Sequence, residues 1–376
     1  MIAHTFFKHK KIFGNFKVLA VFLFFSINSI LAQIDKNATA ETKNLYHNLK
    51  SLAKNKLIFG HHNTVGMGIG WRNKDTINWS SDVNISVGDF PALYGFDLVD
   101  GMSYQKEQVK KIFRQGGIIT YSWHIQNPVT DGYYGDKRGD AMQNILEGKP
   151  YHNKWKAKLD EIATYFNSLE VKGIKVPILF RPFHEHTNGH FWWSDSSISN
   201  KTFREVWEFT IRYLRDECNV HNLLYVYNPT NPIKKGGLND GKYPGNEWVD
   251  IISFDLYWGG EDVSKSILEN SKAVVNFAKK NGKIAAISEA GVGQGLQNSK
   301  INNWITTCIL NPLKNDSIAK EISYWLTWRN LKKNRYWVPL PSYPQHKDFM
   351  RFYNDEMTLF HSDLPNMYTN NYYCKK

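Results

Sequence analysis

The sequence is poor in cysteine and lacks a long run of basic residues. Its three cysteines, Cys218, Cys308 and Cys374, allow at most one disulfide, and none stands in a CxxC or other metal-binding spacing. Although the formal net charge is +12, no run of Lys and Arg forms the stripe that a nucleic-acid partner needs. We therefore interpret the basic balance as a solvated surface and expect no nucleic-acid partner.

Long apolar runs are also absent, except near the amino terminus. There Lys8, Lys10, Lys11 and Lys17 accompany the unbroken apolar run 18–25, and a plausible cleavage point follows Ala32. The run is short for a membrane span, and no later run reaches about 18 apolar residues. We expect residues 1–32 to be a signal peptide and the mature chain to be secreted or periplasmic, without membrane attachment. The alternative is an uncleaved membrane anchor.

The mature chain, residues 33–376, lacks internal repeats, low-complexity tracts and Pro/Ser linkers, which predicts a single domain. What it has is a recurring apolar run bounded by Gly, Pro or Asn, as expected of buried parallel strands. The runs are Lys56–His62, Phe96–Tyr104, Gly116–His124, Val176–Glu185, Asn222–Pro229, Val249–Trp258, Lys283–Gly291 and Ile322–Arg329. The second run carries two Asp and a Gly, which are unusual inside a strand.

The segments between these runs are amphipathic. In Lys154–Leu169 apolar residues recur at spacings of three and four, and Thr202–Glu205 is a capping box that opens another helix. Strand and helix alternating eight times predict the α/β class and a (β/α)8 TIM barrel rather than an open doubly wound sheet.

In such a barrel the chemistry lies at the carboxyl ends of the strands. The polar residues of the predicted strands gather at these ends, among them Glu185 after the fourth run and Glu289 in the seventh, and the amino ends show no comparable cluster. The sequence therefore predicts that Glu185 and Glu289 face each other across the barrel mouth.

Two carboxylates in different surroundings are what a glycosidase uses. Burial raises and Arg181 lowers the pKa expected for Glu185, whereas Tyr257, at the end of the neighbouring sixth strand, could donate a hydrogen bond that keeps Glu289 ionised. A retaining pair lies roughly 5–5.5 Å apart, and about 6.5–9.5 Å indicates inversion. The alternative for Glu185 is a structural ion pair with Arg181.

Aromatic residues make up 15% of the chain, with 13 Trp. Trp123, Trp192, Trp193 and Trp328 fall at strand ends or in the loop after Glu185, where they could stack on sugar rings, although each could instead fill the core.

Histidines also gather at the predicted mouth. His124 and His184 fit hydrogen-bonding groups better than metal ligands, because His184-Glu185-His186 lacks the i, i+4 spacing of a zinc site. His61 and His62 are predicted to be a polar pair at the same mouth.

Several motifs together resemble glycoside hydrolase family 26, over about residues 59–330. They are Arg181-Pro-Phe-His184-Glu185 with Phe191-Trp-Trp193, Ser122-Trp-His124, Phe254-Asp-Leu-Tyr257, Ser288-Glu289-Ala-Gly and Thr327-Trp328-Arg-Asn330. The family consists of retaining (β/α)8 enzymes, mostly exported β-mannanases.

The resemblance implies a role for each matching residue. It makes Glu185 the acid/base and Glu289 the nucleophile. Arg181 and His184 would organise the acid/base, Tyr257 would hold the nucleophile, and His124 and Trp328 would line the subsite of attack. His190 stands where the family usually has the first Trp of its aromatic run, which puts the substrate subtype in doubt.

From the residues and the resemblance we expect a monomeric endo-1,4-β-mannanase that cleaves mannan, galactomannan or glucomannan by double displacement. It should need no metal or organic cofactor, because the carboxylates supply the chemistry. The alternatives are the same mechanism on β-1,3/1,4-glucan or β-1,3-xylan, a catalytically silent polysaccharide-binding protein, and a metal-dependent deacetylase built on the histidines.

Overall fold

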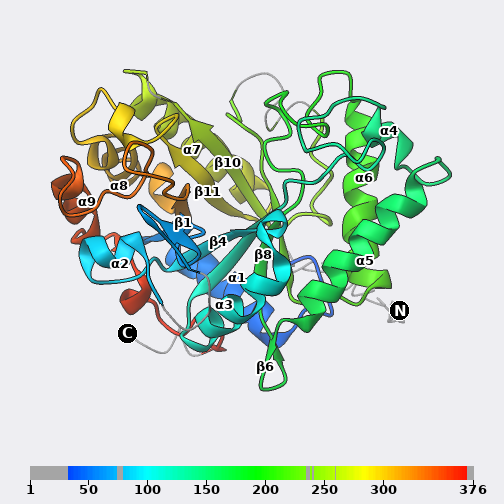
Figure 1. The fold of residues 1–376 in the computed structure, drawn as a ribbon, viewed down its shortest axis with the longest axis horizontal. Coiled ribbons are helices and arrows are strands. Elements are labelled where there is room, and N and C mark those ends of the chain that lie inside the picture. Colours follow the sequence, from blue (N-terminus) through cyan, green and yellow to red (C-terminus); the bar gives the residue numbers. More distant parts are fainter. Residues whose placement is uncertain (1–32, 74–78, 234–237, 239–240, 259, 371–376) are drawn as a thin grey trace, which may run out of the picture. The chain divides into compact units, whose positions relative to one another are not determined.

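The computed structural model describes residues 33–73, 79–233, 238, 241–258 and 260–370, and the predicted signal peptide lies outside them. Within the described residues, eight parallel strands close into a barrel, because β12 pairs back with β1 (Figure 1). In barrel order these are β1 (Leu57–His62), β4 (Leu93–Asp97), β5 (Ile118–Ser122), β8 (Ile178–Arg181), β9 (Leu223–Tyr227), β10 (Ile251–Tyr257), β11 (Ile284–Gly291) and β12 (Tyr324–Thr327). The predicted (β/α)8 barrel is confirmed.

Helices connect the strands and cover the outside of the barrel. They are α1 (Ala40–Leu52), α2 (Asp82–Val87), α3 (Met102–Arg114), α4 (Ala141–Asn144), α5 (His152–Ser168), α6 (Asn200–Arg212), α7 (Val263–Lys280), α8 (Asn311–Lys314) and α9 (His346–Tyr353). Short strands lie outside the barrel ladder or at its edge: β2 (Met67–Gly68), β3 (Trp71–Arg72), β6 (Glu170–Val171), β7 (Ile174–Lys175) and β13 (Thr358–Leu359). No helix in the described part of the chain is long and apolar enough to cross a membrane.

The second predicted strand, Phe96–Tyr104, is placed wrongly. The strand β4 starts earlier, at Leu93, and ends at Asp97, whose side chain accepts a hydrogen bond from the backbone of Val99 at 3.2 Å. Gly101 then takes a left-handed backbone conformation (φ 107°) directly before α3. Asp97 and Gly101 therefore turn the chain out of the sheet, which explains why the predicted run contains residues that are unusual in a strand.

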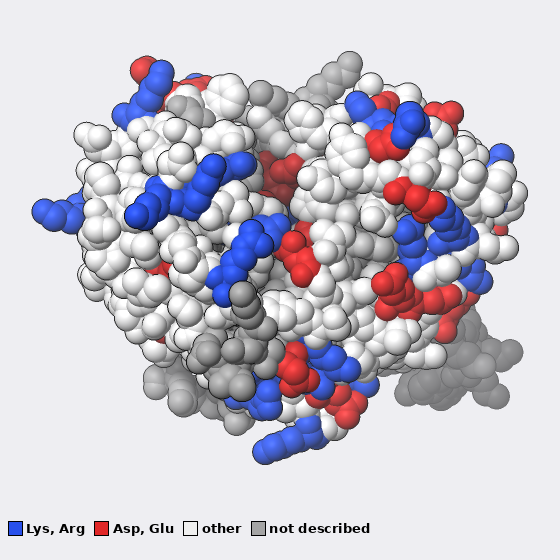
Figure 2. Space-filling view, in the orientation of Figure 1, with Lys and Arg blue, Asp and Glu red and all other residues white. Residues whose placement is uncertain are grey.

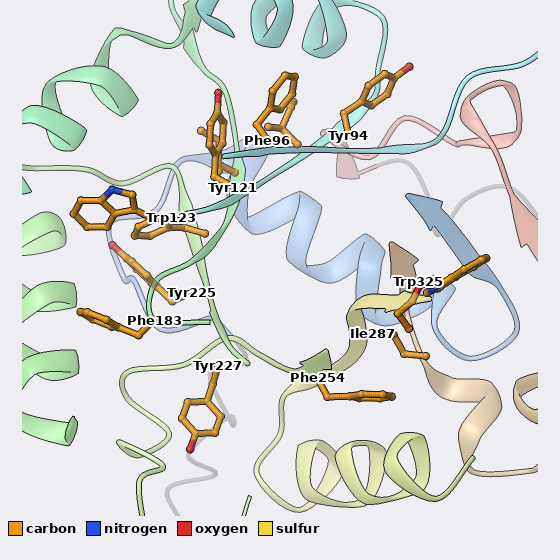
Figure 3. Close-up of a cluster of buried hydrophobic side chains, with 14 of the residues drawn as sticks. Tyr94, Phe96, Tyr121, Trp123, Phe183, Tyr225, Tyr227, Phe254, Ile287 and Trp325 are labelled. Carbon is orange, nitrogen blue, oxygen red and sulfur yellow. Dashed lines mark hydrogen bonds between the residues drawn. The ribbon is translucent and has the colours of Figure 1, made fainter. Parts of the chain in front are cut away.

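The two faces of each barrel strand pack into different layers. Because side chains alternate along a strand, Leu224 and Val226 of β9 join the layer inside the barrel, whereas Tyr225 and Tyr227 join the layer between strands and helices. Figure 3 shows the outer layer, with Phe96, Tyr121, Trp123 and Tyr227 among its members.

Helix α1 covers the amino-terminal end of the barrel. Its buried face packs against the first residues of several strands, including Ile118 and Ile284, and Tyr46 donates a hydrogen bond to the carbonyl of Gly282 at 3.2 Å. Thr39 caps the helix by accepting from the backbone of Thr42 at 3.2 Å. The end of the barrel opposite the polar cluster is therefore sealed by apolar packing.

Candidate active site

A pocket of about 280 Å³ opens at the carboxyl ends of the strands and contains both predicted carboxylates. Its lining is His124, His184, Glu185, Tyr257, Glu289, Gly293, Gln294, Trp328, Arg335 and Trp337. Figure 2 shows a hollow near the middle of the molecular face, with acidic side chains in its depth. The residues that sequence reasoning assembled from separate strands thus lie in one place.

Glu289 owes its direction to an irregularity in β11. The pairing of β10 with β11 shifts register after Phe254, so that Asp255 rather than Leu256 lies opposite Glu289. Ser288, the extra residue, donates to the hydroxyl of Ser253 at 2.8 Å, while Glu289 reaches Arg181 on β8. A bulge lets two consecutive side chains face the barrel interior, which regular alternation forbids.

The carboxylate of Glu289 is buried and receives two hydrogen bonds. Arg181 donates to Oε1 at 2.5 Å, and the hydroxyl of Tyr257 donates to Oε2 at 3.1 Å. Burial and the charge of Glu289 raise the pKa of Tyr257 well above its ordinary value, so that the phenol keeps its proton and acts as the donor. Each carboxyl oxygen of Glu289 is therefore held by one donor.

The alternative of a structural ion pair between Arg181 and Glu185 is wrong, because within the described residues Arg181 forms its ion pairs with Asp255 and Glu289. Its charge lowers the pKa of Glu185, as the sequence predicted. Its guanidinium contacts Glu289, Asp255 at 3.3 Å and the side-chain oxygen of Asn228 at 2.7 Å. The strand ends at Arg181, so that the alternation assumed for the residues after it does not hold. Although burial opposes its charge, Glu289 and Asp255 raise the pKa of Arg181 further above its usual range.

Glu185 lies in an irregular turn after β8. Phe183 and Glu185 both have a left-handed backbone (φ 51°), and the backbone N–H of Glu185 donates to the carbonyl of Asn228 at 2.7 Å. Asn188 donates to its carboxyl oxygen at 2.5 Å. Burial, followed by the charge of Glu289, raises the pKa of Glu185 to about 7. Glu185 is therefore the carboxyl of the pair that can hold a proton near neutral pH.

Three histidines around the pocket differ in charge. Burial lowers the pKa of His62 and His184 well below the usual value, so that both rings are neutral. The ring of His62 stacks on Trp328 with centroids 4.1 Å apart. His124 instead contacts the carboxylate of Asp97 through Nδ1 and has a raised pKa because this attraction outweighs burial.

His61, the neighbour of His62, is fully buried on β1 and has no hydrogen-bond partner for its ring among the described residues. Burial lowers its pKa to about 3, and the ring is therefore neutral. Of the two histidines expected as a polar pair at the barrel mouth, His62 stacks on the pocket residue Trp328. In the described residues, no group of three or more His, Cys, Asp or Glu side chains is arranged to hold a metal ion.

Three of the four predicted sugar platforms are packing residues. Trp123, Trp192 and Trp193 are only 6%, 2% and 0% exposed. Trp123 stacks on Trp155, and the indole N–H groups of Trp192 and Trp193 donate to backbone carbonyls at 2.8 Å. Because each ring packs against other aromatic residues, it has little surface left for a substrate. Trp328, the fourth, lies in the pocket as expected.

Sequence reasoning missed the loop that follows β12. Trp337 and Arg335 of this loop line the pocket. The side-chain nitrogen and oxygen of Asn330 both form hydrogen bonds that fix the loop. Its Nδ2 donates to Asp82 at 2.8 Å and to the carbonyl of Val338 at 2.7 Å, and its oxygen accepts from the backbones of Trp337 and Val338. The feature of the sequence that could have indicated this loop is Trp337, a further Trp after the last predicted strand.

Exposed aromatic residues at this end of the barrel were missed as well. Tyr134, after β5, is 40% exposed and packs edge-on against His124 with centroids 4.8 Å apart. Trp258, the residue after β10, is 49% exposed. These rings, unlike the buried indoles, are open to a sugar.

A (β/α)8 barrel with two glutamates in one pocket at the carboxyl ends of its strands defines the class of glycoside hydrolases that work with a carboxylate pair. The two carboxyls differ in their surroundings, because Glu289 accepts hydrogen bonds from Arg181 and Tyr257 whereas burial raises the pKa of Glu185 to about 7. The chain belongs to glycosyl hydrolase family 26, whose family model matches residues 34–324.

Curated relatives resemble the chain over 61–68% of its length. It is 31% identical to a mannan endo-1,4-beta-mannosidase of Bifidobacterium adolescentis over 287 residues, which are 68% of this chain and 27% of that protein. A Bacillus subtilis mannan endo-1,4-beta-mannosidase is 25% identical, over 61% of this chain and 67% of its own length. The chain thus spans about a quarter of the first relative.

Solved structures agree with the fold. An endo-beta-1,4-mannanase of Cellulomonas fimi superposes with a TM-score of 0.83 at 31% identity, covering 90% of this chain and 80% of that chain. A family 26 beta-mannanase of Bacteroides ovatus has a TM-score of 0.81 at 28% identity, covering 89% and 98%.

Proposed function

We propose that the protein is a retaining endo-1,4-β-mannanase that acts on mannan, galactomannan or glucomannan. Glu185 donates its proton to the glycosidic oxygen while Glu289 attacks the anomeric carbon, which gives a glycosyl-enzyme and a shortened chain. Glu185, now ionised, takes a proton from water, and the water oxygen releases the sugar from Glu289. The names of the related proteins support the choice of substrate.

The observation that carries the chemistry is the difference between the two carboxyls. Glu289 accepts from Arg181 and Tyr257, whereas burial and the charge of Glu289 raise the pKa of Glu185 to about 7. A nucleophile must be ionised and an acid protonated at the same pH, and the raised pKa of Glu185 supports its role as the acid.

The substrate is tested by measuring reducing-sugar release from mannan, lichenan and β-1,3-xylan. We expect release of reducing sugar from mannan. A preference for lichenan or xylan would mean that the same mechanism acts on β-1,3/1,4-glucan or β-1,3-xylan instead. Retention is tested by proton NMR of the first product, which should carry the β-anomer before mutarotation. Chain lengths formed from mannohexaose over time separate endo from exo attack.

A silent polysaccharide-binding protein is the alternative from another class. Glu289→Ala should abolish turnover but leave binding of mannohexaose nearly unchanged, because a truncated carboxylate removes chemistry rather than the cleft. A Glu289→Ala protein with unchanged turnover would refute the assignment of the nucleophile. Loss of activity with a chelator would favour the deacetylase.

His190 bears on the substrate subtype. It stands at the position of an expected Trp, is exposed, and its backbone N–H donates at 2.7 Å to Asn188, the partner of Glu185. We infer that one aromatic platform next to the acid/base is replaced here, so that sugar stacking falls to exposed rings such as Tyr134.

We further propose that the protein is exported and acts as a monomer. Support for export comes from the basic and apolar pattern of residues 1–32. Mass analysis of the secreted protein would test cleavage after Ala32, and sedimentation would test the monomer.

A further inference from the structure

Asp97 is a fully buried carboxylate beside the pocket that the mechanism above does not use. It accepts hydrogen bonds from Ser122 Oγ at 2.8 Å, from the backbones of Val99 and His124 at 3.2 Å each, and from Nδ1 of His124. No Lys or Arg of the described residues hydrogen-bonds to it. A buried carboxylate is costly unless it is neutralised or paired, and His124 is the partner that can carry the positive charge.

The electrostatics of the pair favour charge on both members. Burial alone would raise the pKa of Asp97, yet the charge and hydrogen bond of His124 bring it well below its usual range. Burial would lower the pKa of His124, and Asp97 reverses that shift, aided by Glu289 and Glu185. An aspartate and an imidazolium are therefore the stable forms.

His124 is surrounded by titratable groups from every neighbouring element. They are His62 of β1, Asp97 and Asp100 at and after β4, Tyr134 after β5, Arg181, His184 and Glu185 at and after β8, and Glu289 of β11. The pKa values of His62 and His184 are both lowered, so the cationic ring of His124 lies between neutral ones.

We propose that Asp97 is a positioning residue that holds His124 in the pocket as an imidazolium. This rests on the function proposed above. Nδ1 is engaged by Asp97, so the second N–H of the ring, at Nε2, is left for the substrate, and His124 lines the pocket beside both glutamates. The imidazolium donates a charge-assisted hydrogen bond to an oxygen of the sugar under attack, and its charge lowers the pKa of Glu185.

The charge of His124 is tested directly by nitrogen-15 NMR of histidine-labelled protein, with the signal assigned from its loss in His124→Gln. We expect both ring nitrogens to be protonated at pH 7 in the unmodified protein. Asp97→Asn should make the same ring neutral at pH 7. A neutral His124 in the unmodified protein at pH 7 would overturn the proposal, whether or not mannan is hydrolysed.

The kinetic test uses Asp97→Asn and the matched control Ser122→Ala, which removes one hydrogen bond from Asp97 but keeps its charge. On mannohexaose, Asp97→Asn should lower kcat/KM by about tenfold to a hundredfold, the loss expected of a charge-assisted hydrogen bond. It should also move the alkaline limb of the pH profile upward, because Glu185 loses a cationic neighbour. Ser122→Ala should leave that limb in place.

A lower rate with an unmoved limb in Asp97→Asn would mean a purely structural role and overturn the proposal. If Asp97→Asn does not fold, the titration of His124 in the unmodified protein still decides. If the unmodified protein does not cleave mannan, the proposed function fails by itself, because the NMR result for His124 does not depend on turnover.

Discussion

Among single residues, Glu185 links the rate to pH. As the general acid it must be protonated, and its pKa is raised to about 7 by burial and by the charge of Glu289. We therefore predict that the alkaline limb of kcat/KM on mannohexaose has its midpoint near pH 7 and approaches a tenfold fall per pH unit above about pH 8. The pH profile between 5 and 9 measures this limb.

An activated substrate separates this cause from unfolding. A dinitrophenyl leaving group needs no protonation, so the limb should disappear for an aryl β-mannobioside, and Glu185→Gln should retain its glycosylation step on that substrate. The assignment of Glu185 fails if the limb persists at the same pH with the activated substrate.

The hydroxyl of Tyr257 can be removed without changing the rest of the side chain. Tyr257→Phe deletes the hydroxyl that donates to Glu289 at 3.1 Å and keeps the ring beside Trp337. We predict a fall in kcat of about tenfold to a hundredfold, because the hydroxyl holds the carboxylate that attacks the sugar, and the lost hydrogen bond should also lower the thermal midpoint. Steady-state kinetics and a melting curve measure the two effects.

Tyr121→Phe is the matched control for Tyr257→Phe. It removes a buried hydroxyl that bonds Tyr165 at 2.6 Å in the outer layer of the core, away from the pocket. It should cost some stability and leave kcat unchanged. Equal losses of kcat in both variants would contradict the role given to Tyr257.

At the scale of elements, two loops and a bulge set what the pocket can do. The bulge in β11 turns Glu289 inward, and the left-handed residues after β8 place Glu185. Such backbone irregularities carry strain and occur near functional sites. The loop after β12 brings Trp337 to the same pocket.

We predict that Asn330→Ala weakens substrate binding more than chemistry. Asn330 makes four hydrogen bonds at 2.7–3.0 Å that fix the loop carrying Arg335 and Trp337, and it lies away from the two glutamates. The variant should raise KM for mannohexaose severalfold with a smaller change in kcat. Urea unfolding should show a loss of about 2–6 kcal/mol, at about 0.5–1.5 kcal/mol for each of the four bonds.

Asn354→Ala, in an exposed position at the end of α9, is the control and should change neither KM nor stability appreciably. If Asn330→Ala lowers kcat and leaves KM unchanged, the loop acts on the chemical step rather than on binding.

These irregular features also mark what the sequence could and could not predict. Apolar runs bounded by Gly, Pro or Asn located the barrel strands, because parallel strands buried on both faces are nearly uniform in polarity, and β4 alone was misplaced. Chain order and strand ends then brought Glu185, Glu289 and Tyr257 together. The partner of Arg181 was missed, because it depends on a bulge and on a turn at Phe183 that no residue pattern signals. Burial of Trp123, Trp192 and Trp193 depends on packing between helices, which periodicity at a strand end does not reveal.

At the scale of the whole molecule, the barrel separates chemistry from stability. The pocket lies at the carboxyl ends of the strands, and α1 covers the opposite end, where Leu45, Tyr46 and Leu49 are fully buried against residues inside the barrel. Activity therefore depends on the carboxyl ends of the strands, and stability depends more on their amino ends.

We predict from this separation that Leu49→Ala destabilises the protein without affecting its chemistry. Leu49 has no exposed surface, and its truncation leaves a cavity that costs about 2–5 kcal/mol. Urea unfolding should show that loss, whereas kcat/KM on mannohexaose, measured well below the melting temperature, should equal that of the unmodified protein. Lys43→Ala, which removes an exposed hydrogen bond from the same helix, should change stability by less than about 0.5 kcal/mol. A fall in kcat/KM for folded Leu49→Ala would show that packing at the sealed end is coupled to the geometry of Glu185 and Glu289.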